Sequence, residues 1–144
     1  MMERRRVAWL AQAGLAVVML FTASCGPSGP KLYPVQGKVM FAGKPAAGAL
    51  VTLHKTDAEN STTPIPSGIV REDGSFQLST YRPNDGAPAG EYDVAITWTE
   101  EKGNADTGDL KSKLPLRYSD PKTSQLKATI GNSATTLPTF ELTK

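Results

Sequence analysis

Cysteine and histidine are almost absent from this chain of 144 residues, which contains one of each, Cys25 and His54. A single cysteine cannot form a disulfide within the chain. A single histidine excludes a metal site or an acid–base mechanism that needs two imidazoles. The sequence also has no Gly-x-Ser-x-Gly nucleophile motif and no glycine-rich phosphate loop. We therefore expect a protein that is not an enzyme and that carries no metal or cofactor.

An excess of charge of one sign is also lacking. The chain has 16 basic and 14 acidic residues, and three of the basic ones are the adjacent Arg4, Arg5 and Arg6. Removing these arginines and Glu3 with the N-terminal segment leaves 13 basic and 13 acidic residues. Without a positive stripe, the chain lacks the attraction to phosphates that dominates nucleic-acid binding. DNA and RNA are excluded as expected partners.

The N-terminus has the pattern of an export signal. The three arginines precede an apolar run from Val7 to Phe21, which is followed by the small residues 22–24 and then by Cys25. The arginines stay inside the cell, so the rest of the chain is expected outside. This segment resembles bacterial lipoprotein signals, in which the cysteine is diacylated and becomes the new N-terminus. The resemblance implies a lipoprotein signal peptide over residues 1–24 and lipidation at Cys25.

Lipidation is the role we expect for the single cysteine. One acyl chain gives a membrane association constant of only about 10⁴ M⁻¹, whereas two or three chains, such as palmitate, give stable attachment. Residues 25–32 then form the lipidated Cys25 and a Gly/Pro-rich tether. The membrane is the partner through these acyl chains, at the outer side of the inner membrane or at the outer membrane. Two alternatives stay open: ordinary signal-peptidase cleavage, and an uncleaved single-span anchor.

After the tether, apolar and polar residues alternate with a period of two, which predicts strands and no helix of useful length. In residues 92–98, for example, Tyr92, Val94, Ile96 and Trp98 point to one face. Clusters of glycine, proline and asparagine separate the alternating stretches. Seven strands are predicted, over residues 35–41, 49–54, 69–71, 75–78, 90–99, 126–130 and 140–142. The fold class is therefore all-β, with one β-sandwich over residues 33–144.

Three local features complete this prediction. Asp73-Gly74 supplies the positive φ angles of a tight hairpin. Residues 100–113 are charged and have no apolar period, so we expect a loop. Ser119 or Asp120, followed by Pro121, is expected to cap a short helical turn.

Several segments resemble a known family of domains. Gly43-Lys44-Pro45, Glu72-Asp73-Gly74-Ser75-Phe76 and Gly90-Glu91-Tyr92-Asp93-Val94 are similar to carboxypeptidase regulatory-like, or transthyretin-like, domains. The likeness extends from Tyr33 to Trp98 and implies a seven-stranded transthyretin-like (prealbumin-like) Greek-key sandwich. With Arg117-Tyr118-Ser119-Asp120-Pro121 added, the chain resembles short bacterial lipoproteins that carry one such domain and no assigned activity. Within the motif, Tyr92 can pack its ring while its hydroxyl meets a backbone partner.

Residues 117–126 are the most site-like stretch. Arg117, Tyr118, Thr123 and Ser124 bring together a cation, a phenol and hydroxyls, so they are the possible ligand-binding residues. The competing interpretation is a segment that crosses between sheets with Tyr118 packed down.

The expected function is a non-catalytic binding or structural module of the cell envelope, with an envelope protein or glycan as a possible partner. The first alternative is a glycan- or peptide-binding protein that uses loops 81–88 and 117–124. The second is a small transthyretin-like hydrolase, although hydrolases of this fold rely on several histidines and an arginine. His54 is expected to be a surface strand residue without a catalytic partner.

Overall fold

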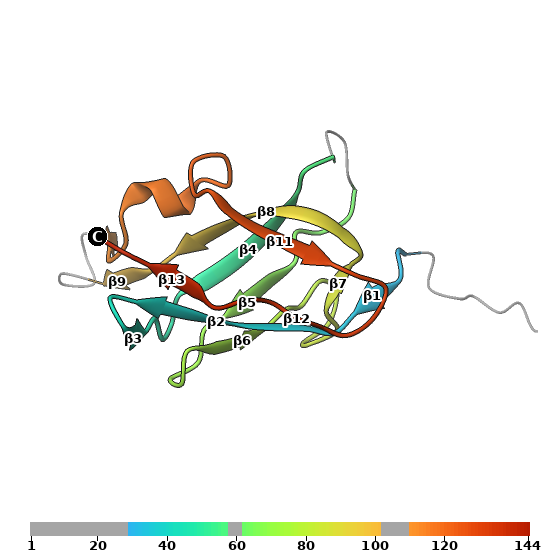
Figure 1. Cartoon of the computed structure of the whole chain (residues 1–144), viewed down its shortest axis with the longest axis horizontal. Helices are drawn as coiled ribbons and strands as arrows, with labels where there is room; N and C mark the ends of the chain where they lie inside the picture. Colours follow the sequence, from blue (N-terminus) through green and yellow to red (C-terminus); the bar gives the residue numbers. More distant parts are fainter. Residues whose placement is uncertain (1–28, 58–61, 102–109) are drawn as a thin grey trace, which may run out of the picture.

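The computed structural model describes residues 29–57, 62–101 and 110–144. These residues form an all-β sandwich in which two sheets pack face to face around one core (Figure 1). The predicted signal peptide and Cys25 lie outside the described residues. Within the described part, no helix is long and apolar enough to cross a bilayer.

The first sheet has the order β11-β8-β4-β5, and all of its strands run antiparallel. Its strands are β11 (Leu126–Ile130), β8 (Gly90–Thr97), β4 (Leu50–Lys55) and β5 (Ser67–Ile69). β8 is central, with Val94 opposite both Leu53 and Leu126. The large apolar side chains of residues 92–98 explain the central position of β8, because an interior strand buries one face completely.

The second sheet is built around β2 (Val35–Phe41). β2 pairs antiparallel with β3 (Lys44–Pro45) and β6 (Ser75–Gln77), and parallel with β12 (Thr135–Thr136) and β13 (Phe140–Leu142). Val35, Gly37 and Val39 are buried while Gln36 and Lys38 are exposed, as the alternation predicts. Gly37 is required because a methyl group there would lie 2.7 Å from the Phe76 ring.

The core fills the space between the two sheets. Phe76 is fully buried and stacks on Phe140, with ring centroids 6.4 Å apart and planes at 15°. Tyr92, Val94 and Ile96 are also buried, whereas Trp98 follows the end of β8, is half-buried and meets Phe41 edge-on. Burial of a large apolar side chain contributes about 1.5–3 kcal/mol, so this layer supplies the main favourable term in folding.

The seven predicted strands correspond to β2, β4, β5, β6, β8, β11 and β13, with ends shifted by up to two residues. The described residues contain six further short strands: β1 (Leu32–Tyr33), β3, β7 (Ala87–Pro88), β9 (Thr99–Glu101), β10 (Leu110–Ser112) and β12. Two or three residues are too few to show a period, so pattern reading missed them.

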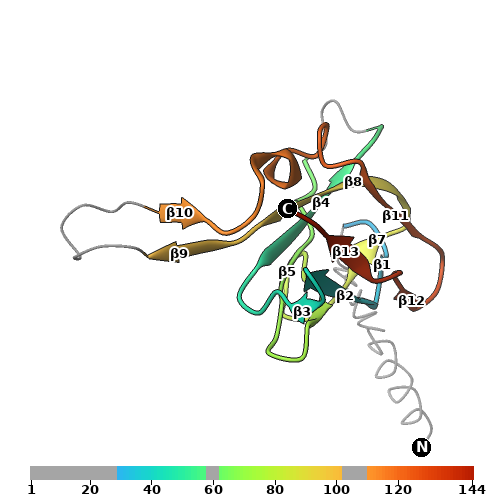
Figure 2. The same ribbon diagram turned by 60° about the vertical axis from the view of Figure 1, so that its left-hand side comes forward.

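The expectation of a loop over residues 100–113 was wrong at its two ends. β9 pairs antiparallel with β10, and the pair projects from the sandwich (Figure 2). Glu100 lies opposite Lys111 and forms an ion pair with Lys113 at 3.3 Å. Opposite charges stabilise a cross-strand pair, and residues 99–101 contain no apolar side chain, so an apolar period gave no sign of these strands.

Two turns also differ from expectation. Of the two residues Asp73 and Gly74, only Gly74 has a positive φ, of 84°, while the Asp73 carboxylate accepts a hydrogen bond from the Ser75 backbone N–H at 2.9 Å. In the part of the chain that the structure describes, the one helical element is η1 (Leu116–Ser119), a 3₁₀ turn that ends before Asp120. Asp120 instead caps the following turn, because its carboxylate accepts the Lys122 backbone N–H at 2.8 Å.

The sandwich has two distinct ends along its longest axis (Figure 1). We call the end that contains residues 29–33, 62–66 and 79–88 the tether end. Here β1 pairs with β7, and Pro30 lines the same cavity as Ile65 and Pro88. The far end contains residues 113–119 and 143–144, where η1 meets the C-terminal residues.

Candidate functional site

Arg117, from η1, binds the C-terminal residues. Its guanidinium donates hydrogen bonds to the Thr143 carbonyl at 3.0 Å, to the Lys144 carbonyl at 3.3 Å and to the Tyr118 hydroxyl at 3.2 Å. It also lies over the Tyr118 ring, 4.7 Å from the centroid. The residue is exposed, but its donors are directed at the chain's own acceptors.

Tyr118 packs into the core while its hydroxyl stays within this network. The backbone N–H of Thr143 donates to the Tyr118 hydroxyl at 3.1 Å. This hydrogen bond, together with the adjacent Arg117, lowers the pKa of Tyr118 from 10.0 to about 8, against the opposing effect of burial. A phenol with this pKa is more acidic than usual, and hydrogen bonding to the charged form is the main cause.

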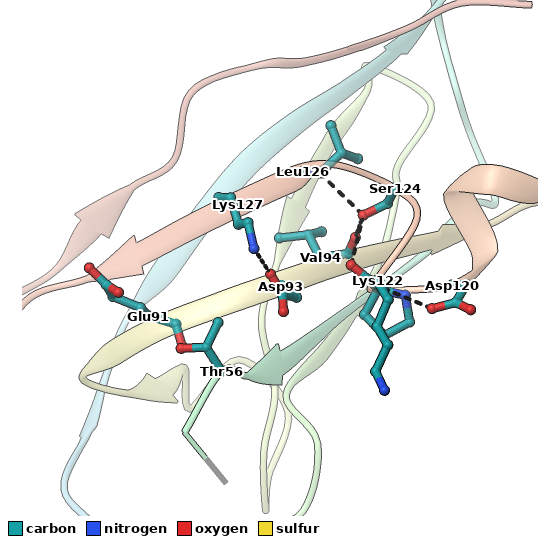
Figure 3. A network of polar contacts seen from close by, with 10 residues as sticks. Thr56, Glu91, Asp93, Val94, Asp120, Lys122, Ser124, Leu126 and Lys127 are labelled. Atoms are coloured by element: carbon teal, nitrogen blue, oxygen red, sulfur yellow. Dashed lines mark hydrogen bonds and ion pairs between the residues drawn. The ribbon is translucent and has the colours of Figure 1, made fainter.

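Thr123 and Ser124 are also used within the chain. The Thr123 hydroxyl donates to the Arg117 carbonyl at 2.8 Å. Ser124 is buried; its hydroxyl donates to the Val94 carbonyl and accepts the Leu126 backbone N–H at 3.2 Å (Figure 3). Ser124 thus holds the start of β11 against β8.

The four predicted ligand-binding residues are therefore close in space, but each has hydrogen-bond partners within the chain. This is the arrangement expected of a segment that crosses between sheets with Tyr118 packed down. Tyr118 and Ser124 are buried, and buried polar groups need such partners for stability. Ligand binding by these residues stays a prediction that no observation tests.

Loop 81–88 lies at the tether end, away from residues 117–124. The Asp85 carboxylate accepts backbone N–H groups from Thr80 at 2.6 Å, Tyr81 at 2.9 Å and Arg82 at 2.8 Å. Burial raises the pKa of Asp85, but these hydrogen bonds outweigh it and hold the pKa below 3.8. The two predicted binding loops occupy opposite ends of the sandwich (Figure 1) and do not form one site.

The tether end contains a cavity of about 280 Å³ that sequence reasoning missed. It is lined by residues from four separate segments: Pro30, Leu53, His54, Lys55, Thr63, Pro64, Ile65, Pro66, Pro88 and Tyr92. The Tyr92 hydroxyl donates to the Pro88 carbonyl at 2.7 Å, which confirms the expected backbone partner. In the sequence, the only sign of this cavity was a set of prolines at separate positions. Their spacing cannot show that they lie together in the folded chain.

His54 is half-buried at this cavity, 3.2 Å from the Thr52 hydroxyl through its Nε2 atom. Asp93 is its cross-strand neighbour, but the Asp93 carboxylate pairs with Lys127 (Figure 3). Among the described residues, no hydrogen bond joins Asp93 to His54. An acid–base pair of the kind a hydrolase needs would require this carboxylate to leave Lys127.

In the described ranges, no group of three or more His, Cys, Asp or Glu side chains is placed to hold a metal ion.

No known protein family matches the sequence. No curated protein matches it either. Among solved structures, the chain is similar to a 9R-lipoxygenase from Cyanothece PCC8801, with 16% identity and a TM-score of 0.39. The match covers 81% of this chain and 17% of the lipoxygenase.

A second solved structure is a DUF3823 family protein from Parabacteroides merdae ATCC 43184, with 15% identity and a TM-score of 0.38. That match covers 80% of this chain and 46% of the other. This chain thus spans less than half the length of either protein. At these TM-scores the likenesses support no inference beyond what the strands of this chain show.

Proposed function

We propose that this protein is an exported lipoprotein, anchored to the cell envelope through acyl chains on Cys25, whose sandwich acts as a non-catalytic binding or structural module. One observation carries the proposal. The only cysteine of the chain follows the arginines, the apolar run and the small residues, and it lies four positions before Gly29, where the described domain begins.

The placement of the tether supports an anchored module. β1, the first strand of the described part, lies at one end of the long axis, and the C-terminus lies at the other (Figure 1). An anchor at Cys25 would therefore hold the tether end near the bilayer and present the far end, with η1 and the β9–β10 hairpin, to the envelope. A partner protein or glycan would meet that far end first.

The transthyretin-like assignment is part of this proposal. β4 and β5 are neighbours in the first sheet, β6 pairs with β2 in the second sheet, and β8 returns to the first sheet beside β4. A bridge joins Ser67, the first residue of β5, to Ser79, two residues after the end of β6. A chain that crosses from one sheet to the other and then returns beside an earlier strand is typical of sandwiches with Greek-key connections, and this path favours the assignment.

The rival functions have less support. A glycan or peptide site built from loops 81–88 and 117–124 together would need both loops at one end. Either loop could act alone, and the exposed cation Arg117 would be the group to test. A hydrolase would need a base, and His54 faces Thr52 while its carboxylate neighbour, Asp93, is paired with Lys127.

Metabolic labelling with palmitate tests the anchor. We expect the native protein to carry label and to sediment with membranes, and the Cys25→Ala variant to carry none. Labelled Cys25→Ala, or unlabelled native protein recovered from the soluble fraction, would refute the proposal. A His54→Ala variant that still sediments with membranes would agree with a non-catalytic module. If the native protein hydrolysed a test substrate and His54→Ala did not, the hydrolase would be favoured instead.

A further inference from the structure

Two large apolar side chains are exposed at the tether end. Ile65 is 52% exposed and Tyr81 is 53% exposed. Single exposed apolar residues are common on protein surfaces, so exposure alone decides nothing. Their position is the informative feature, because both lie against the residues that lead to Cys25.

The contacts that place them are direct. Ile65 lines the same cavity as Pro30. The Tyr81 hydroxyl would lie 3.6 Å from a methyl group built on Gly29, so the ring is packed beside the tether. Ile65 and Tyr81 are held by different loops, residues 62–66 and 79–86, that meet at this end.

The length of the tether brings these side chains close to the bilayer. Gly29 lies four positions after Cys25. A fully extended chain spans about 3.5 Å per residue, so Gly29 can stand at most about 14 Å from an acylated Cys25 at the membrane surface. Amphipathic surfaces bury their apolar groups about 5–10 Å into the headgroup boundary, which is within this reach.

We propose that the tether end of the sandwich docks on the lipid surface, with Ile65 and Tyr81 as the inserted side chains. This inference rests on the proposed lipid anchor at Cys25. Tyrosine suits such a position because its ring is apolar and its hydroxyl can stay at headgroup level. The anchor supplies the affinity, and docking fixes the orientation of the domain.

The charges at this end define the kind of lipid surface. Lys31, Lys55 and Arg82 are exposed here, together with Asp57 and Glu91, and the Asp85 carboxylate is held by backbone N–H groups. Positive and negative groups are thus mixed, and Lys55 pairs with Asp57 at 3.5 Å. Docking should therefore depend on apolar contact, with little preference for anionic headgroups and little loss at high salt.

The test is tryptophan quenching by brominated lipid. Cleavage before Cys25 removes Trp9, and Trp98→Phe then gives a mature chain without tryptophan. Ile65→Trp and Tyr81→Trp probes are added to this background in lipidated protein, reconstituted in dibrominated phosphatidylcholine vesicles. Leu116→Trp is the matched control, because Leu116 is 76% exposed but lies at the far end. Thermal melting in detergent verifies that each variant is folded.

We expect Ile65→Trp and Tyr81→Trp to lose most of their fluorescence and Leu116→Trp to keep it, in both low and high salt. If vesicles carry the protein but neither tether-end probe is quenched, docking is refuted and the anchor stands. Equal quenching of all three probes would also refute docking at one end. Protein that fails to float with vesicles would overturn both the anchor and the docking.

Discussion

The two ends of the sandwich use their side chains in opposite ways. At the far end, Arg117 and Tyr118 are hydrogen-bonded to Thr143 and Lys144, so the polar groups are used to hold the chain terminus. At the tether end, the loops are also hydrogen-bonded, but Ile65 and Tyr81 remain in solvent. The difference shows that polar residues clustered in a sequence can serve to hold the fold together. Apolar residues that are far apart in the sequence can come together as an exposed apolar surface.

The largest effect on stability is expected from a glycine substitution at the tether end. Gly86, at the tether end, has a φ of +90°, and a methyl group there would lie 1.9 Å from the Tyr33 carbonyl oxygen. Gly43, in the turn between β2 and β3, has a φ of +77° but no atom within 4 Å. We expect Gly86→Ala to lower the free energy of unfolding by about 3 kcal/mol or more, through strain and a backbone clash.

Gly43→Ala is the matched control, because it adds the same methyl group at a positive φ without a clash. It should cost only about 1–2 kcal/mol. Urea denaturation of both variants gives the comparison. Equal losses would mean that β1 and β7 do not pack as closely as Gly86 requires.

Removing single hydroxyl groups should show that the far-end network is structural. Tyr118→Phe removes the acceptor for Thr143 and Arg117, and we expect a loss of about 1–3 kcal/mol because one donor is charged. Tyr92→Phe removes one hydrogen bond to Pro88 at the tether end and should cost about 1 kcal/mol. Thermal melts of the two variants test the order. A larger loss for Tyr92→Phe would contradict the proposed importance of the far-end network.

Asp85→Asn tests the loop that presents Tyr81. The asparagine amide oxygen can replace one carboxylate oxygen as a hydrogen-bond acceptor, but the NH₂ group cannot accept a hydrogen bond. We therefore expect the free energy of unfolding to fall by about 1–2 kcal/mol at neutral pH. Because the folded pKa of Asp85 is depressed, the stability that its ionised form contributes is present above the unfolded pKa of about 3.8 and is lost as pH falls through the folded value. The wild type and the variant should therefore converge in acid. A difference that persists at low pH would rule out the carboxylate as its source.

The smallest predicted effect is a shift in one tyrosine titration. Tyr118 should ionise at a pKa of about 8, below its ordinary value of 10.0. Because the folded pKa is depressed, the additional stability that ionisation of Tyr118 brings is complete above the unfolded pKa and is lost as pH falls from about 10 to about 8. Ultraviolet absorbance of tyrosinate should show this early step in the wild type and lose it in Tyr118→Phe. In Arg117→Gln the step should move to higher pH.

Most of the fold was predictable, because alternation with a period of two requires only that one face be buried. Val35, Val39, Tyr92, Val94 and Ile96 all lie in the core as this pattern requires. β9 and β10 could not be predicted from alternation, because they show no alternation of apolar residues and one of their cross-strand pairs joins Glu100 to Lys111. Trp98 was assigned to a strand that ends one residue earlier, at Thr97.

The candidate site was less predictable than the fold. The stretch 117–124 attracted attention for its polar residues, but composition could not show that Thr143 and Lys144 lie beside Arg117. The cavity at His54 and the pair Ile65 and Tyr81 depend on loops distant in sequence that converge only in the folded chain. Convergence of this kind is a tertiary property, and no local period encodes it.

The central claim is that Cys25 anchors the domain to a membrane. The most direct measurement is the intact mass of the mature protein, extracted in detergent from its native membrane, beside the Cys25→Ala variant. The account predicts an N-terminus at Cys25 that bears two or three acyl chains, absent from the variant. An unlipidated soluble product that begins near Gly26 would contradict both the anchor and the docked orientation of the sandwich.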